Sequence, residues 1–169
     1  GFKTTKSLFY FIFLNFEPVS ALLPSLACGI RINKLVLGCC SGFSVYSQEC
    51  YSASFDNRDG NGNYFNDAVG ESIVNSSKGA CCYIGNSRYG WYANFSTDGS
   101  SQFYDRHFFD AIFGQDYPFY TIGGCFTESK FAGTPMLDDN VMRWCYYNLN
   151  LFGDPTLDIW TDTPSEFTA

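Results

Sequence analysis

The sequence predicts an α/β fold, in which helices cover a central β-sheet. Short apolar segments with the character of strands alternate along the chain with segments that have helical spacing, and this alternation is typical of α/β proteins. The composition agrees, because 46% of the 169 residues are hydrophobic and 20% are aromatic. One domain of this size therefore has enough apolar area to form a core, which excludes intrinsic disorder.

Strands are expected at four places. Gly79–Gly85 is the clearest, because it is small, apolar and uncharged, as in a strand that is covered on both faces. Lys34–Cys40 contains a short apolar run that is followed by Ser and Gly, and Phe43–Ser47 alternates apolar and polar residues. Pro155–Trp160 is predicted to be the terminal strand.

Three segments are predicted to be helices. Ala68–Asn75 follows Asp67, an acidic residue that suits the N-terminal end of a helix dipole. Ser101–Phe113 has apolar and histidine side chains spaced four residues apart, and Gly114 ends it. Asn140–Tyr147 is the third.

The first 33 residues differ in character from the rest. Lys3 and Lys6 precede the apolar run Leu8–Leu14, and small residues and Cys28 follow, an order similar to that of a secretory signal. We favour a second interpretation, a truncated or wrongly joined piece of a longer protein, and leave this segment out of the fold prediction. The run is too short to cross a bilayer, which needs about 20 apolar residues.

Charge and cysteine content exclude several classes of protein. A formal net charge of -7 argues against nucleic acid as a partner, because phosphate binding needs clustered Lys and Arg. The eight cysteines form no C-x-x-C pattern and the chain has one histidine, so we expect no zinc site and no metal or other cofactor. Most cysteines are expected to be small buried residues, and disulfides are possible in an oxidising compartment.

Three places could carry chemistry. Cys50 follows an apolar strand where a polar loop begins, a position that suits either a nucleophile or a buried strand-end cysteine. His107 is the only imidazole, and a packed or surface position on its predicted helix is the preferred interpretation. Asp59–Asn63 has the composition of a calcium loop but lacks the required Gly and Glu, which favours a solvated turn.

Several separate motifs resemble the gingipain-type cysteine peptidases. The segment Val45–Asp56 resembles their nucleophile segment, and Gly85–Asn86–Ser87–Arg88–Tyr89–Gly90–Trp91 and Asn148–Leu157 are the most specific matches. Further matching pieces occur in the same order: Glu71–Asn75, Gly79–Ala80, Phe108–Phe109 and Arg143–Trp144. The resemblance covers residues 43 to 162.

This resemblance implies a caspase-like α/β sandwich, with a mostly parallel central sheet, helices on both faces and an incomplete N-terminal part. It implies that residues 34–162 are a partial peptidase domain, between an atypical segment 1–33 and a tail 163–169. Cys50 would be the nucleophile that forms an acyl-enzyme with a peptide or protein substrate. Ser87, Arg88 and Trp91 would bind substrate, and Asp154 and Pro155 would set a turn.

One departure from the family pattern keeps alternatives open. The family places its catalytic histidine upstream of the cysteine, whereas residues 1–49 contain no histidine. The chain is therefore expected to be an incomplete, secreted or cell-surface cysteine endopeptidase domain. The first alternative is a catalytically inactive peptidase-like binding module. A secreted structural or carbohydrate-binding module is suggested only by the aromatic content, and most aromatic residues lie in apolar contexts that indicate a core.

Overall fold

The structure is a computed structural model that describes residues 10–14, 32–39, 42–77, 79–93, 95–96, 98–114 and 119–159. Its strands are β1 (Tyr10–Leu14), β2 (Ile32–Cys39), β3 (Gly42–Tyr46), β4 (Cys82–Asn86) and β5 (Leu149–Gly153). Its helices are α1 (Val69–Asn75), α2 (Ser100–Phe113), α3 (Ile122–Gly133) and α4 (Asn140–Asn148), with a short 3-10 helix η1 (Thr134–Met136) after α3. Most of the N-terminal segment interpreted as signal-like lies outside the described residues.

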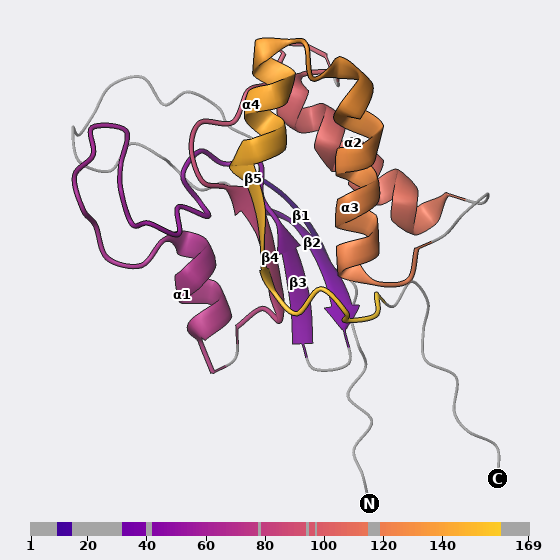
Figure 1. Cartoon of the computed structure of the whole chain (residues 1–169). Coiled ribbons are helices and arrows are strands. Elements are labelled where there is room, and N and C mark those ends of the chain that lie inside the picture. Colours follow the sequence, from indigo (N-terminus) through magenta and orange to yellow (C-terminus); the bar gives the residue numbers. More distant parts are fainter. Residues whose placement is uncertain are drawn as a thin grey trace, which may run out of the picture.

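The described strands form one sheet in the order β1-β2-β3-β4-β5 (Figure 1). Only β3 and β4 pair in parallel, and the other three neighbouring pairs are antiparallel. The prediction of a mostly parallel sheet is therefore wrong. The physical reason is clearest at β2 and β3: β2 ends at Cys39 and β3 begins at Gly42, and so short a connection can join only antiparallel strands.

Helices cover both faces of the sheet, as predicted. Val45 on β3 and Tyr83 on β4 pack with Ile73 and Val74 of α1 on one face. Tyr46 and Ile84, the next residues of β3 and β4, belong to the core on the other face. Helices α2, α3 and α4 cover that face (Figure 1). This alternation follows from the two-residue period of a strand. All five residues of β4 are buried, as expected for a strand covered on both faces.

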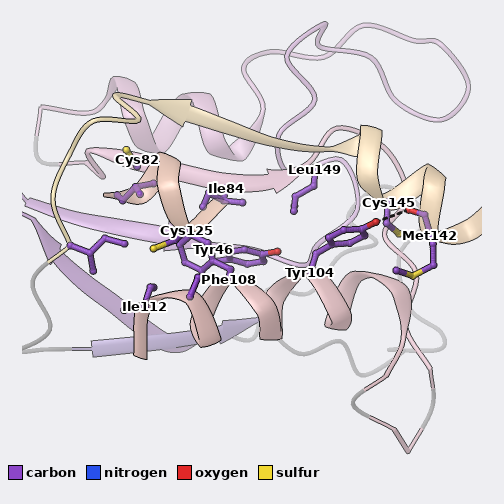
Figure 2. Packing of buried hydrophobic residues seen from close by; sticks show 13 residues of the cluster. Tyr46, Cys82, Ile84, Tyr104, Phe108, Ile112, Cys125, Met142, Cys145 and Leu149 are labelled. Atoms are coloured by element: carbon purple, nitrogen blue, oxygen red, sulfur yellow. Dashed lines mark hydrogen bonds between the residues drawn. The ribbon is translucent and has the colours of Figure 1, made fainter. Parts of the chain in front are cut away.

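The larger core lies between the sheet and helices α2, α3 and α4 (Figure 2). Aromatic rings fill its centre, where the ring centroids of Tyr46 and Phe108 are 5.1 Å apart. The Tyr104 hydroxyl donates a hydrogen bond of 3.1 Å to the Met142 carbonyl oxygen, which joins α2 to α4. Four aromatic side chains are buried in the described structure, whereas thirteen are exposed. The expectation that most aromatic residues form the core is therefore wrong, because many of them lie on helix surfaces and in loops.

The predicted terminal strand Pro155–Trp160 is wrong over residues 155–159, and Trp160 lies outside the described residues. Strand β5 ends at Gly153, before the proline, and the Asp154 carboxylate accepts hydrogen bonds from the backbone N–H and hydroxyl of Thr156. These bonds, together with a proline that has no N–H to donate, produce a turn instead of a strand. The expectation that Asp154 and Pro155 set a turn is confirmed, although no described strand follows it.

Helix α3 and strands β1 and β5 were absent from the sequence prediction. Gly123 and Gly124 near the start of α3 suggest a loop, yet a Cβ atom on Gly123 would lie 2.6 Å from Pro155 Cβ and 2.7 Å from its carbonyl oxygen. Glycine is present because the helix packs directly against the turn after β5. Strand β1 belongs to the segment that was left out, and it pairs antiparallel with β2.

Candidate active site

Cys50 lies in a turn that follows β3, at the carboxyl end of the parallel β3–β4 pair. The Ser47 N–H donates a hydrogen bond of 2.8 Å to the Ile84 carbonyl oxygen, so the turn begins directly at the edge of the sheet. The Cys50 side chain is half-buried, and its Sγ lies 4.0 Å from the Gly90 carbonyl oxygen. The sequence predicted this place for the sulfur, an edge where functional groups often gather in parallel sheets.

The other described cysteines are in a different environment. Cys82, Cys125 and Cys145 are free but buried, as predicted for most cysteines of the chain. Burial raises the pKa of Cys82 to about 11 and that of Cys125 to about 12, and it also raises the pKa of Cys145. Cys81 is disulfide-bonded. Among the free cysteines in the described ranges, Cys50 alone is not fully buried.

Asn86, the last residue of β4, holds the turn that carries Cys50. Its side-chain Nδ2 donates hydrogen bonds to the carbonyl oxygens of Gln48 (3.1 Å) and Glu49 (3.2 Å). The backbone carbonyl oxygen of Asn86 accepts a hydrogen bond of 2.9 Å from the Ala53 N–H. The side-chain amide of Asn86 therefore fixes the backbone before Cys50, and its main-chain carbonyl oxygen fixes the backbone after it.

The loop that follows β4, residues 87–92, lies against the same turn. The Tyr51 N–H donates a bond of 2.9 Å to the Arg88 carbonyl oxygen. A Cβ atom on Gly90 would lie 2.8 Å from Asn86 Nδ2 and 2.9 Å from the Gln48 carbonyl oxygen, so only glycine permits this approach. Trp91 comes next and is half-exposed, and its backbone N–H donates a hydrogen bond of 3.0 Å to Ser101 Oγ.

Ser87 and Arg88, two of the residues predicted to bind substrate, line a pocket of about 520 Å³ between this loop and α4. Ser87 Oγ is buried and donates to the Asn148 carbonyl oxygen at 3.2 Å. The Arg88 guanidinium forms a two-point ion pair with Asp56, with bonds of 2.6 and 3.0 Å. This pairing is the main cause that lowers the pKa of Asp56 to about 2.

The sequence was compared with models of known protein families, with curated proteins and with solved structures. The model of Peptidase family C25 matches residues 33–160, which is well over half of the chain and includes every site residue named above. The chain belongs to peptidase family C25. No curated protein and no solved structure matches it significantly. The resemblance to gingipain-type cysteine peptidases is therefore confirmed at the level of the family.

Two buried carboxyl groups of this family C25 member lie at or beside the Cys50 turn, and sequence reasoning did not single them out. Asp105 on α2 accepts a hydrogen bond of 2.5 Å from Gln48 Nε2, and burial raises its pKa to about 6. Burial also raises the pKa of Glu49, the neighbour of Cys50. Only the fold brings α2 to the end of β3, so no local sequence signal could have indicated this arrangement.

His107 is not brought into contact with Cys50. It is half-buried on α2, where its ring packs on Phe103 with the ring centroids 4.2 Å apart. The preferred interpretation, a packed helical histidine, agrees with this position.

The loop that contains Asp59 is a turn. The Asp59 carboxylate accepts hydrogen bonds of 2.8 and 2.9 Å from the N–H groups of Asn61 and Asn63. A bridge between Arg58 and Tyr64 closes the loop. In the part of the chain that the structure describes, no group of three or more His, Cys, Asp or Glu residues could hold a metal ion. No helix in that part is long and apolar enough to cross a membrane.

Proposed function

We propose that this chain is a cysteine-type endopeptidase domain of the gingipain type with Cys50 as its nucleophile. The observation that carries the proposal is a free, half-buried thiol at the carboxyl edge of the parallel β3–β4 pair, in a member of a cysteine peptidase family. Among the described free cysteines, the alternatives are buried in the core. A nucleophile must be accessible to substrate, and of the free cysteines that the structure describes only Cys50 meets that condition.

The proposed reaction proceeds through an acyl-enzyme. The Cys50 thiolate attacks the carbonyl carbon of a peptide bond, the C–N bond breaks and the amine leaves with the proton that the thiol has lost. Water then attacks the thioester, which releases the carboxylic acid and restores the thiol. Backbone N–H groups near Cys50 stabilise the oxyanion that forms in both steps. None of these steps requires a cofactor.

We assign substrate binding to the loop after β4. Trp91 forms a wall of the specificity pocket, because it is half-exposed and directly follows Gly90, whose carbonyl oxygen is the neighbour of Cys50 Sγ. Ser87 and Arg88 line the adjoining pocket. The substrates are peptides or proteins, and we propose a secreted or cell-surface location, which the disulfide at Cys81 supports.

The caspase-like architecture is also part of the proposal. The arrangement that supports it is local: a parallel strand pair with helices on both faces, and a cysteine directly after the first strand of the pair. The antiparallel strands on both sides extend this unit.

One observation favours a second candidate function, a catalytically inactive peptidase-like binding module. Residues 1–49 contain no histidine, and His107 contacts Phe103 instead of Cys50. Thiol nucleophiles of peptidases are usually activated by an adjacent general base, so the absence of a histidine beside Cys50 in the described residues favours the binding module.

A peptidyl probe with a thiol-reactive acyloxymethyl ketone group distinguishes the two functions. The native chain is treated with a mixture of such peptides and with iodoacetamide, and the labelled cysteine is identified by mass spectrometry. A peptidase labels at Cys50 with the peptidyl probe, and the Cys50→Ala variant does not label. A Cys50 that reacts with iodoacetamide but never with the peptidyl probe would contradict the proposal and favour a binding module.

A further inference from the structure

The pocket beside the Cys50 turn has a charge that is unusual for this protein. The whole chain has 17 Asp and Glu against 10 Lys and Arg. Yet two arginines and no carboxylate line this pocket, whose walls are Ser87, Arg88, Asn140, Arg143, Trp144, Tyr147 and Asn148. A concave site with positive charge on an acidic protein attracts anions selectively.

The two arginines of the pocket differ in what they already bind. Arg88 is neutralised by Asp56, so its guanidinium has a carboxylate partner. Among the described residues, Arg143 donates to two uncharged oxygens, the Leu137 carbonyl and Asn140 Oδ1. Within the described ranges no carboxylate lies within ion-pair distance of Arg143. Its positive charge is thus exposed at the pocket and uncompensated there.

Aromatic rings give the pocket its apolar part. Trp144 is anchored by a bond of 2.8 Å from its Nε1 to the Tyr89 carbonyl oxygen, so its ring is fixed against the loop after β4. Tyr147, one turn further along α4, is largely exposed. Fixed rings beside a guanidinium suit a ligand that combines a short apolar stem with an anionic end.

The pocket is connected directly to the proposed catalytic turn. Tyr89, which receives the Trp144 bond, also packs edge-to-face on Tyr51 with ring centroids 4.9 Å apart. Tyr51 is the residue after Cys50, and its N–H is bonded to the Arg88 carbonyl oxygen. A peptide that lies across the Cys50 turn can therefore place one of its groups in the pocket.

We infer that this pocket is a subsite for a carboxylate of the peptide substrate, held by Arg143 and packed on Trp144 and Tyr147. The inference rests on the proposed function, because it names the chemistry that the same site recognises. The carboxylate is either an acidic side chain or the C-terminal carboxylate of the peptide. A guanidinium binds both with the same charge-assisted hydrogen bonds.

Binding of three matched peptides to the full chain with Cys50→Ala tests this inference without turnover. The peptides are Ac-Ala-Ala-Glu-Ala-Ala-NH₂, the same peptide with Gln for Glu, and the Gln peptide with a free C-terminal carboxylate. Binding is followed through the NMR signal of the Trp144 indole N–H. We expect at least one carboxylate peptide to bind about tenfold more tightly than the amidated Gln peptide. If the Glu peptide binds more tightly, the pocket recognises an acidic side chain. If the Gln peptide with a free C-terminus binds more tightly, the pocket recognises the C-terminal carboxylate.

Matched variants connect the preference to the pocket. Arg143→Gln removes the charge and is expected to abolish the tenfold preference, whereas Arg143→Lys retains most of it. Arg106→Gln is the control, because Arg106 is an arginine on α2 that is not among the pocket residues. Equal binding of all three peptides, or no binding at millimolar concentration, would overturn the inference.

The peptide-binding experiment and the labelling experiment test the subsite and the peptidase assignment separately. If the peptidyl probe labels Cys50 but the three peptides bind equally, the peptidase assignment stands and the carboxylate subsite is wrong. If the carboxylate peptide binds but Cys50 never labels, the subsite is correct and belongs to a binding module.

Discussion

The Asn148 side chain donates a hydrogen bond of 3.1 Å from Nδ2 to Oδ1 of Asn86, and the two residues are only 5% and 1% exposed. This pair joins the end of α4 to the end of β4. Asn86 in turn holds the backbone of Gln48 and Glu49, next to Cys50. Two buried amides therefore connect the helix that lines the pocket with the turn that carries the thiol.

Asn148→Ala is expected to lower the free energy of unfolding by about 3 kcal/mol. The Asn148 amide also donates to the Tyr89 carbonyl oxygen and accepts from Ser87 Oγ and the Arg88 N–H, so truncation leaves several buried polar groups without partners. Urea denaturation measures the loss. Asn150→Ala is the control, since that half-buried side chain makes one bond, to the Asn148 carbonyl oxygen. Equal losses in the two variants would contradict the role of the pair.

Gly153→Ala is expected to destabilise the fold more than Gly62→Ala does. Both glycines have positive φ, 116° for Gly153 and 81° for Gly62, so each alanine costs about 1 kcal/mol or more of backbone strain. At Gly153 a Cβ atom would also overlap the Cys81 carbonyl oxygen and lie 2.7 Å from Cys82 Sγ, whereas nothing lies within 4 Å at Gly62.

Thermal unfolding of the two glycine variants gives the comparison directly. We expect a loss of about 3 kcal/mol for Gly153→Ala, because overpacking adds to the strain. A Gly62→Ala variant that is equally destabilised would show that crowding at the end of β5 contributes nothing.

Local sequence patterns correctly predicted the helices and strands that have a strong pattern of their own. The uncharged segment around β4 and the four-residue spacing in α2 gave correct elements, because burial on both faces and helical amphipathicity leave direct traces in the sequence. Helix α3 was missed because Gly123 and Gly124 favour a loop unless the packed turn at Pro155 is known.

The sequence could predict only those residues of the candidate site that belong to a recognisable motif. Cys50 follows a strand and Trp91 lies in a motif of the family, so both could be named from the sequence. The pairing of Asn86 with Asn148, and the approach of Asp105 to Gln48, depend on contacts between residues more than 50 positions apart in the chain. Such contacts follow from topology, which local spacing does not encode.

His107→Ala is expected to leave the reaction of Cys50 with the peptidyl probe, and any peptide cleavage, within about twofold of the unchanged chain. The His107 ring packs on Phe103 of its own helix and has no contact with Cys50 in the described structure. The second-order rate of labelling measures this. A loss as large as that of Cys50→Ala would mean that His107 acts as the base and that the site is assembled differently.

Asp105→Asn is expected to stabilise the protein at neutral pH and to change how stability depends on pH. Burial raises the pKa of Asp105 from 3.8 to about 6, so between these values the folded chain keeps a proton that the unfolded chain loses. Stability therefore falls as pH rises through this window, and above it the ionised carboxylate carries the full burial cost. The cost is at most about 3 kcal/mol, from about two pH units at 1.36 kcal/mol each.

Asparagine keeps an acceptor for Gln48 Nε2 but has no charge, so this part of the pH dependence should disappear. Urea denaturation at several values between pH 4 and pH 7 measures the difference between Asp105→Asn and the unchanged chain. That difference should be smallest at the acidic end and largest at neutral pH. Asp110→Asn, at an exposed position of the same helix, should give a difference near zero throughout. A constant difference for Asp105→Asn would mean that the carboxyl group ionises normally in the folded state.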